Sequence, residues 1–188
     1  GINPPTMYLK DFLYENMGRV FKVNENSGII DYGISRGTVK FDFDNDGDLD
    51  LFVVKQTPLW KDYNSTERVK SKLFRNDTEN DNNWLKVSLN GNESTSRGLG
   101  ARVKIVSDDN KLMREVDGGS SHISQNTSIL HFGLGDVNII DSLVVTWPGG
   151  KKQILTKIPT NKHINIDEIE SKEVSFIDWI VNFFNFAS

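Results

Sequence analysis

Hydrophobic and polar residues alternate on both sides of an acidic stretch in the first third of the chain. Val39, Phe41 and Phe43 alternate with polar residues at its start, and apolar side chains recur at every second position over residues 49–53. Period two in β-branched, aromatic and aliphatic residues predicts β-strands. The acidic stretch is therefore predicted to be a loop between two strands.

The same alternation returns in several short segments between residues 84 and 168. It is clear at residues 84–89, 101–106, 143–147 and 164–166, and weaker at 111–116 and 153–158, with Gly, Asn, Asp and Pro turn signals between the segments. Short strands at this spacing predict an all-β protein with a β-sandwich-like domain. The expected core residues are Trp84, Val87, Val103, Ile105, Val145 and Trp147.

Residues 169–188 follow a different pattern, with apolar side chains at helical spacing. They predict a short C-terminal helix that packs on the body of the protein. An interfacial membrane anchor is the alternative, but such anchors usually carry Lys or Arg on the polar face, which here is mainly Asp178, Asn182 and Asn185. The apolar tract is too short to span a bilayer, so no transmembrane span is expected.

The acidic stretch holds five aspartates within nine residues: Asp42, Asp44, Asp46, Asp48 and Asp50. Hard oxygen ligands at alternate positions, with Gly47 to allow a sharp turn, suit Ca²⁺ better than Mg²⁺, which demands octahedral geometry. We expect four of the side chains to bind the ion, and Asp48 to contribute its backbone carbonyl. A solvated acidic turn that binds nothing is the alternative.

An EF-hand does not fit this loop. An EF-hand needs a bidentate Glu at its twelfth position and a helix on each side. Counting from Asp42, the twelfth residue is Val53, and both flanks have the pattern of strands. The unit is therefore predicted to be strand, calcium loop, strand.

The first part of the chain resembles a known repeat. Asp42-x-Asp44-x-Asp46-Gly47-x-x-Asp50, followed by Leu51-Phe52-Val53, closely resembles the calcium loop of FG-GAP (VCBS) repeats. The similar tetrapeptides at residues 13–16 and 73–76 lie about one blade apart, as in a repeat. The resemblance implies that residues 1–83 belong to a β-propeller. Because a propeller needs at least four blades, we expect the chain to be the C-terminal piece of a longer protein.

The second part resembles the ASPIC/UnbV domain, which follows FG-GAP repeats in the cartilage acidic protein family and in many secreted bacterial proteins. The resemblance implies a domain over residues 84–168 but no established reaction. The motifs that carry it, in the expected order, are Asn83-Trp84-Leu85-Lys86-Val87, Gly98-Leu99-Gly100-Ala101-Arg102-Val103, Gly118-Gly119-Ser120-Ser121, Ser124-Gln125, His131-Phe132-Gly133-Leu134-Gly135 and Val145-Thr146-Trp147-Pro148-Gly149-Gly150.

Composition narrows the functional classes. The net charge of -4 argues against nucleic-acid binding, and the absence of cysteine excludes disulfides and thiolate chemistry. No two of the three histidines have metal-ligand spacing, and no nucleophile-elbow motif surrounds the Ser120–Ser124 segment. We therefore expect no catalytic residues and no enzyme activity.

These observations favour an extracellular calcium-binding structural or interaction module. Extracellular calcium sites are weak, with Kd of about 10⁻⁴–10⁻³ M, so such a loop is filled outside the cell. The expected location is secreted or at the cell surface, and the expected partner is an extracellular protein or a glycan. Trp60 and Tyr63 are candidates for sugar stacking, with a core role or disorder as the alternatives. The alternative is a non-catalytic accessory part of a secreted enzyme whose active site lies in the missing blades.

Overall fold

The computed structural model describes residues 10–29, 31, 33–56, 70–107, 110–119 and 122–170. Every regular element in these ranges is a strand, which confirms the all-β prediction. The described residues therefore contain no helix that could cross a membrane. The strands are β1 (Tyr14–Asn16), β2 (Phe21–Val23), β3 (Ile34–Phe41), β4 (Asp50–Gln56), β5 (Lys72–Phe74), β6 (Asn83–Asn90), β7 (Arg102–Ser107), β8 (Asn110–Glu115), β9 (Leu130–Gly135), β10 (Ile139–Thr146), β11 (Lys152–Pro159) and β12 (Lys162–Asp167).

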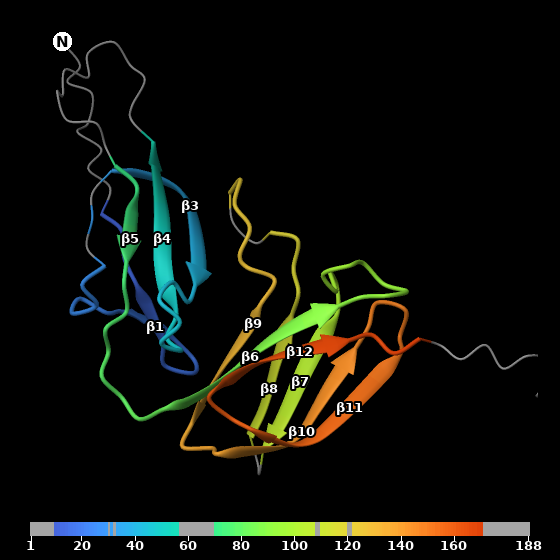
Figure 1. The fold of residues 1–188 in the computed structure, drawn as a ribbon. Helices are drawn as coiled ribbons and strands as arrows, with labels where there is room; N and C mark the ends of the chain where they lie inside the picture. Colours follow the sequence, from blue (N-terminus) through green and yellow to red (C-terminus); the bar gives the residue numbers. More distant parts are fainter. Residues whose placement is uncertain are drawn as a thin grey trace, which may run out of the picture.

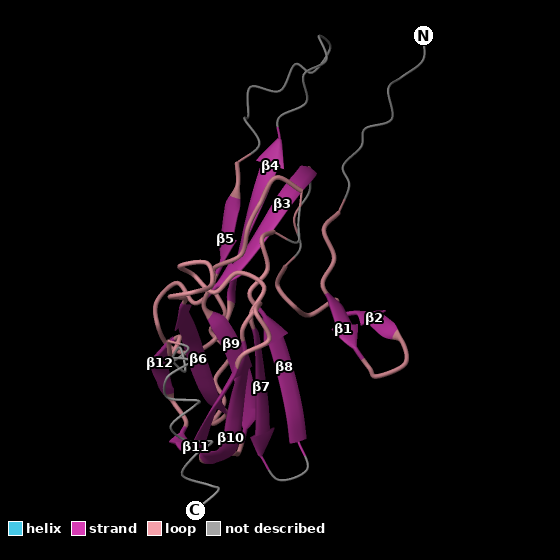
Figure 2. Ribbon diagram, turned by 90° about the vertical axis from the view of Figure 1, so that its right-hand side faces the viewer, coloured by secondary structure: helices cyan, strands magenta, loops and turns pink. Residues whose placement is uncertain are grey.

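The first part of the chain forms a three-stranded antiparallel sheet in the order β3-β4-β5 (Figure 1). The hairpin β1-β2 stands apart from this sheet in Figure 2. The register of β3 and β4 pairs Phe41 with Asp50, so the acidic stretch is the loop between two strands, as predicted. A propeller blade has four strands, and the described residues give three here, so the blade stays a prediction.

A buried lysine ties the N-terminal segment to this sheet. The side chain of Lys55 on β4 is fully buried and forms ion pairs with Asp11 and, at 3.4 Å, with Asp31. Asp31 also accepts a hydrogen bond from Lys72 Nζ on β5 at 2.8 Å. Because a buried charge is costly without a partner, these pairs fix the segment before β3 against β4 and β5.

Strands β6 to β12 form a second unit of two sheets, which we call the two-sheet unit. One sheet has the order β11-β10-β7-β8 and the other β12-β6-β9. All pairs are antiparallel except β12 with β6, which runs parallel. One hydrophobic cluster contains side chains from both sheets, so the two sheets share a single core, as expected of a sandwich-like domain.

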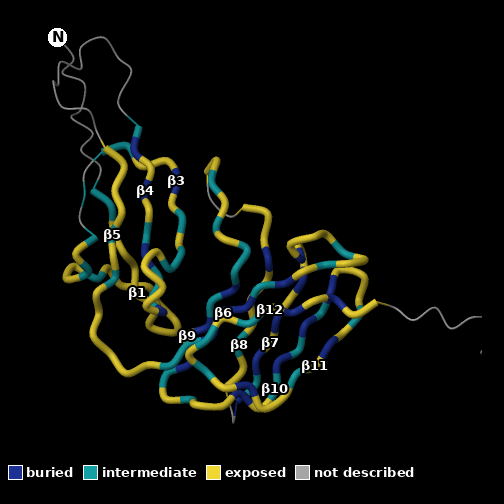
Figure 3. Tube along the Cα trace, in the orientation of Figure 1, coloured by how far each residue is buried: buried dark blue, intermediate teal, exposed yellow. Residues whose placement is uncertain are grey.

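The core of the two-sheet unit follows the alternation seen in the sequence. On β7, Val103 and Ile105 are buried while Arg102 and Lys104 are exposed, and Figure 3 shows the buried positions gathered in this unit. Five of the six expected core residues are buried, each contributing about 1.5–3 kcal/mol: Val87, Val103, Ile105, Val145 and Trp147.

Trp84 is the exception, and its assignment to the core was wrong. It is only partly buried, and it lies on the face of β6 opposite to Leu85 and Val87, which are both fully buried. The odd spacing between Trp84 and Val87 already places them on opposite faces of a strand. Trp84 therefore faces away from the core.

Two predictions fall on residues outside the described ranges. The C-terminal helix predicted for 169–188 lies outside them from residue 171 onward. Trp60 and Tyr63, considered for sugar stacking, also lie outside them.

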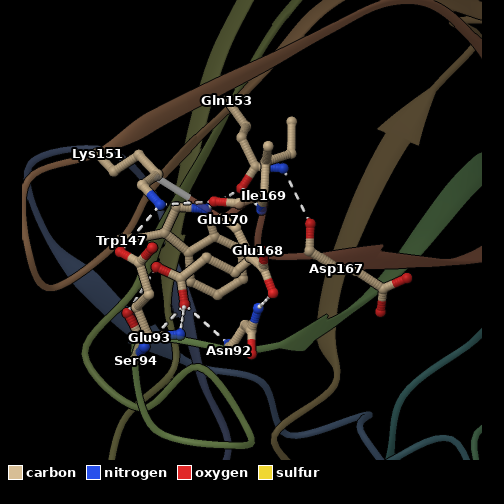
Figure 4. A network of polar contacts seen from close by, with 10 residues as sticks. All are labelled: Asn92, Glu93, Ser94, Trp147, Lys151, Gln153, Asp167, Glu168, Ile169 and Glu170. Carbon is tan, nitrogen blue, oxygen red and sulfur yellow. Dashed lines mark hydrogen bonds and ion pairs between the residues drawn. The ribbon is translucent and has the colours of Figure 1, made fainter. Parts of the chain in front are cut away.

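The end of β12 is fixed by a buried carboxylate. Glu168 is 6% exposed, and its Oε2 accepts hydrogen bonds from the backbone N–H groups of Asn92, Glu93 and Ser94 at 2.8–3.0 Å (Figure 4). Its Oε1 accepts a hydrogen bond from Ser94 Oγ at 2.9 Å. Glu168 thus holds the loop after β6 against the end of β12, the strand that pairs with β6.

Candidate metal site

The aspartate loop, residues 42–50, leads from the end of β3 into the start of β4. Its chain reverses through left-handed backbone at Asn45 (φ 63°) and Gly47 (φ 102°). The N–H of Gly47 donates a hydrogen bond to Asp42 Oδ2 at 3.1 Å, so the loop folds back on its first carboxylate. The predicted turn at Gly47 is therefore present.

Three of the five aspartates come together. Asp42, Asp44 and Asp50 each offer a carboxylate oxygen, and these oxygens lie within 4.8 Å of one another. Oxygens bound to one Ca²⁺ at 2.3–2.6 Å lie at most about 5 Å apart. The spacing of the three groups is therefore compatible with a shared ion.

Asp46 and Asp48 are not part of this group. Asp46 Oδ1 accepts a hydrogen bond from the N–H of Asp48 at 2.8 Å, which stabilises the turn. Burial and then the charge of Asp46 raise the pKa of Asp48, with Asp42 adding to the effect and His131 and Asn80 opposing it. Burial and neighbouring negative charge both disfavour the ionised form of a carboxyl group.

Asp50 is the most buried of the group, with 1% exposure. Its Oδ2 accepts a hydrogen bond from the N–H of Phe43 at 2.6 Å, and its Oδ1 accepts one from the N–H of Asn76 at 2.8 Å. Asn76 belongs to the tetrapeptide that the sequence singles out as a repeat motif. The two backbone donors hold Asp50 in place from both sides, so its position does not depend on a metal.

Asp42 carries the unsatisfied atom of the site. Its side chain is 4% exposed and its Oδ2 accepts hydrogen bonds from Gly47 N–H and Lys86 Nζ. Its Oδ1 is buried and has no hydrogen-bond partner. A buried acceptor without a partner is destabilising, and such groups call for an explanation. The donor set and this atom together fit a hard cation.

The two-sheet unit supplies the surface on which the loop rests. Lys86 on β6 and His131 on β9 are partners across the strand pair and project from the outer face of the sheet. Lys86 Nζ lies 2.7 Å from Asp42 Oδ2. His131 Nε2 lies 2.6 Å from the carbonyl oxygen of Gly47, and donates to it because a carbonyl only accepts.

Trp84 completes this contact surface. Its ring stacks on that of His131, with 6.5 Å between centroids, and Lys86 Nζ lies 4.9 Å from its centroid. A Cβ at Gly47 would lie 1.9 Å from Trp84 Nε1, so the loop backbone packs directly on the indole. A cleft of about 420 Å³ opens beside the contact, lined in part by Asp42, Lys86 and His131.

Sequence reasoning did not find Trp84, Lys86 and His131 as neighbours of the loop. Alternation along β6 contains part of the signal, because it places Trp84 and Lys86 on the face opposite the core. Nothing in the local pattern says what covers that face, since the loop lies about forty residues earlier in the chain.

The motifs of the two-sheet unit agree with a comparison of the chain with protein families. Residues 91–173 match the ASPIC and UnbV family. The matched range begins just after β6 and covers β7 to β12, and this match supports the resemblance that the motifs of the two-sheet unit carry. The resemblance of residues 42–53 to FG-GAP repeats stays a prediction.

Similarity to curated proteins reaches beyond that range. The chain is 30% identical over 131 residues to cartilage acidic protein 1 of Homo sapiens and of Mus musculus, and 31% identical over 134 residues to that of Xenopus tropicalis. These alignments cover 69–71% of this chain and 18–19% of the relatives. The chain thus spans about a fifth of the length of the relatives that it matches.

Proposed function

We propose that the aspartate loop binds Ca²⁺ and that the protein is a non-enzymatic, calcium-stabilised module of an extracellular protein. The observation that carries the proposal is the buried, unpartnered Oδ1 of Asp42 beside the carboxylates of Asp44 and Asp50. A cation there would neutralise crowded negative charge and give this oxygen a partner. Asp46 and the backbone carbonyl of Asp48 are further candidate ligands, although they are not part of the group formed by Asp42, Asp44 and Asp50.

The donor set favours Ca²⁺ over Mg²⁺. Ca²⁺ accepts six to eight oxygen ligands in flexible geometry, whereas Mg²⁺ requires near-ideal octahedral geometry and retains water. Asp50 is held by two backbone donors and Asp44 is partly open to solvent, with a side chain 29% exposed. Water could complete the coordination of the ion on the side of Asp44.

The setting and the partner follow from the resemblances. The relatives are named for cartilage, a tissue consisting largely of extracellular matrix, which supports a secreted or cell-surface location. We propose that residues 1–83 are part of an FG-GAP propeller and that the ordered surface binds an extracellular protein or a glycan. Calcium would act by fixing the loop between β3 and β4.

The proposal predicts that Asp44→Asn abolishes or strongly weakens Ca²⁺ binding. Asp44 is the best position for the test because its nearest ion-pair partner, Arg75, is 3.9 Å away, whereas Asp42 and Asp50 also hold the backbone of the loop. Isothermal titration calorimetry with Ca²⁺ on the wild type and the variant measures the effect. We expect wild-type binding with a Kd of about 10⁻⁴–10⁻³ M or tighter.

Asp136→Asn is the matched control, because it makes the same change at an exposed position after β9. It should bind Ca²⁺ as the wild type does. Wild-type binding that survives in Asp44→Asn would move the ion away from the loop and overturn the proposal.

A further inference from the structure

Lys86 reaches from β6 of the two-sheet unit into the aspartate loop. Its Nζ lies 2.7 Å from Asp42 Oδ2 and 3.3 Å from Asn45 Oδ1. The side chains of Lys86 and Asp42 are 8% and 4% exposed. The ammonium group of Lys86 is thus buried against the carboxylate of Asp42, which belongs to the candidate metal site.

We propose that Lys86 is an internal cation that neutralises the aspartate loop when no metal is bound and thereby sets the affinity of the loop for Ca²⁺. The inference rests on the proposed function, because it requires Ca²⁺ at the loop. It adds that metal binding is coupled to the contact between the first sheet and the two-sheet unit.

The two oxygens of Asp42 give the physical reason. Oδ2 is bound by Lys86, while Oδ1 is buried and has no hydrogen-bond partner. A Ca²⁺ ion that takes Oδ1 would share one carboxylate with the ammonium group, so the two positive charges would lie within a few ångströms of each other. Partly buried charges are poorly screened by salt, so the repulsion weakens Ca²⁺ binding. Linkage requires that Ca²⁺ weaken the hold of Lys86 to the same extent.

The remaining contacts do not depend on the charge of Lys86. The Gly47 backbone packs on Trp84, and the Gly47 carbonyl accepts a hydrogen bond from His131. The cleft beside the loop gives the lysine side chain space to move away from Asp42. These contacts can therefore keep the loop on the domain while the ammonium group yields its place to the metal.

Lys86→Met tests the inference in two measurements. Calorimetry with Ca²⁺ should give a Kd about tenfold lower than that of the wild type, because the competing charge is gone. Chemical unfolding in EDTA should show the variant less stable than the wild type, because Asp42 then lacks its cation, and added Ca²⁺ should close that gap. Lys86→Arg keeps the charge and should bind Ca²⁺ more weakly than Lys86→Met does.

Lys104→Met is the matched control, since Lys104 is exposed on β7 of the opposite sheet, and its Kd should equal that of the wild type. If Lys86→Met does not fold, Lys86→Gln retains a hydrogen-bond donor and removes only the charge, and its Kd should also fall. The inference is overturned if the wild type binds Ca²⁺ and the folded variant without the charge has an unchanged or higher Kd. That result does not contradict the calcium site itself. A wild type that binds no Ca²⁺ overturns the proposed function and the inference with it.

Discussion

Gly47 is the residue at which the backbone of the aspartate loop packs on the two-sheet unit. Its φ of 102° lies in the left-handed region, which glycine adopts at little cost. Its backbone also packs on the Trp84 indole with no room for a Cβ. The glycine is therefore required twice, once by the turn and once by the contact.

Gly47→Ala is expected to destabilise the protein by roughly 2–4 kcal/mol, because it adds backbone strain to a steric clash with Trp84. Urea unfolding in EDTA measures the loss without a contribution from metal. Gly149→Ala is the control, since a Cβ there meets nothing within 4 Å and φ is not left-handed. Equal stability of the two variants would mean that the loop does not rest on Trp84.

Single residues show where sequence reasoning stops. The alternation of aspartates and the glycine predicted the loop and its turn, because both depend on neighbours in the chain. The grouping of Asp42, Asp44 and Asp50 without Asp46 depends on how the loop folds in space. The position of Lys86 beside Asp42 depends on the packing of two distant segments, which no local pattern contains.

The pairing of β12 with β6 shows how one element is held by a loop distant in sequence. The two strands run parallel, and Glu168 follows β12 directly, with its carboxylate in the turn after β6 (Figure 4). Burial raises the pKa of Glu168, but the hydrogen bonds from Ser94, Asn92 and Glu93 outweigh it, so that the pKa is lowered from its ordinary value of 4.5. The ionised carboxylate therefore stabilises the closure of this end of the sheet.

Glu168→Gln should lower the free energy of unfolding at neutral pH by about 1–3 kcal/mol, because charge-assisted hydrogen bonds become neutral ones. A carboxylate with a lowered pKa in the folded state stabilises above its unfolded pKa and loses that effect as the pH falls through the folded value. The difference between wild type and variant should therefore shrink below pH 4.5.

Chemical unfolding at a series of pH values checks this prediction. The control is Glu170→Gln, which makes the same change at an exposed carboxylate. Glu170 accepts a hydrogen bond from the side chain of Asn92, whereas Glu168 accepts hydrogen bonds from backbone N–H groups. A difference for Glu168→Gln that persists unchanged into acid would contradict a role for the ionised carboxylate.

Strands were predictable where alternation was clear. β6, β7 and β10 lie where the sequence predicts them, and the weaker segments became β8 and β11. β9 is not among the predicted strands, because Gly133 and Gly135 are poor strand formers. In the structure the register of β6 and β9 shifts opposite these glycines, and β9 still alternates with Leu130, Phe132 and Leu134 buried.

The two parts of the molecule meet through the loop and through β3. Besides the contacts of Lys86 and His131, the N–H of Lys40 donates to Asn126 Oδ1 at 3.0 Å, and Ser124 Oγ donates to the Thr38 carbonyl at 3.4 Å. The first sheet therefore contacts the two-sheet unit through its β3–β4 loop and through β3, and both units are seen in Figure 1. The sequence predicted two kinds of segment in this order, but their mutual contact is a long-range property that the sequence pattern does not contain.

Thermal unfolding in EDTA and in millimolar Ca²⁺ is the most direct test of calcium as a stabilising ligand of this protein. Ligand at about a hundred times its Kd stabilises the folded state by about 2.7 kcal/mol, which raises the melting temperature. We expect a rise for the wild type with Ca²⁺, a smaller rise with Mg²⁺, and none for Asp44→Asn. Equal melting temperatures of the wild type in EDTA and in Ca²⁺ would contradict a calcium site in the aspartate loop.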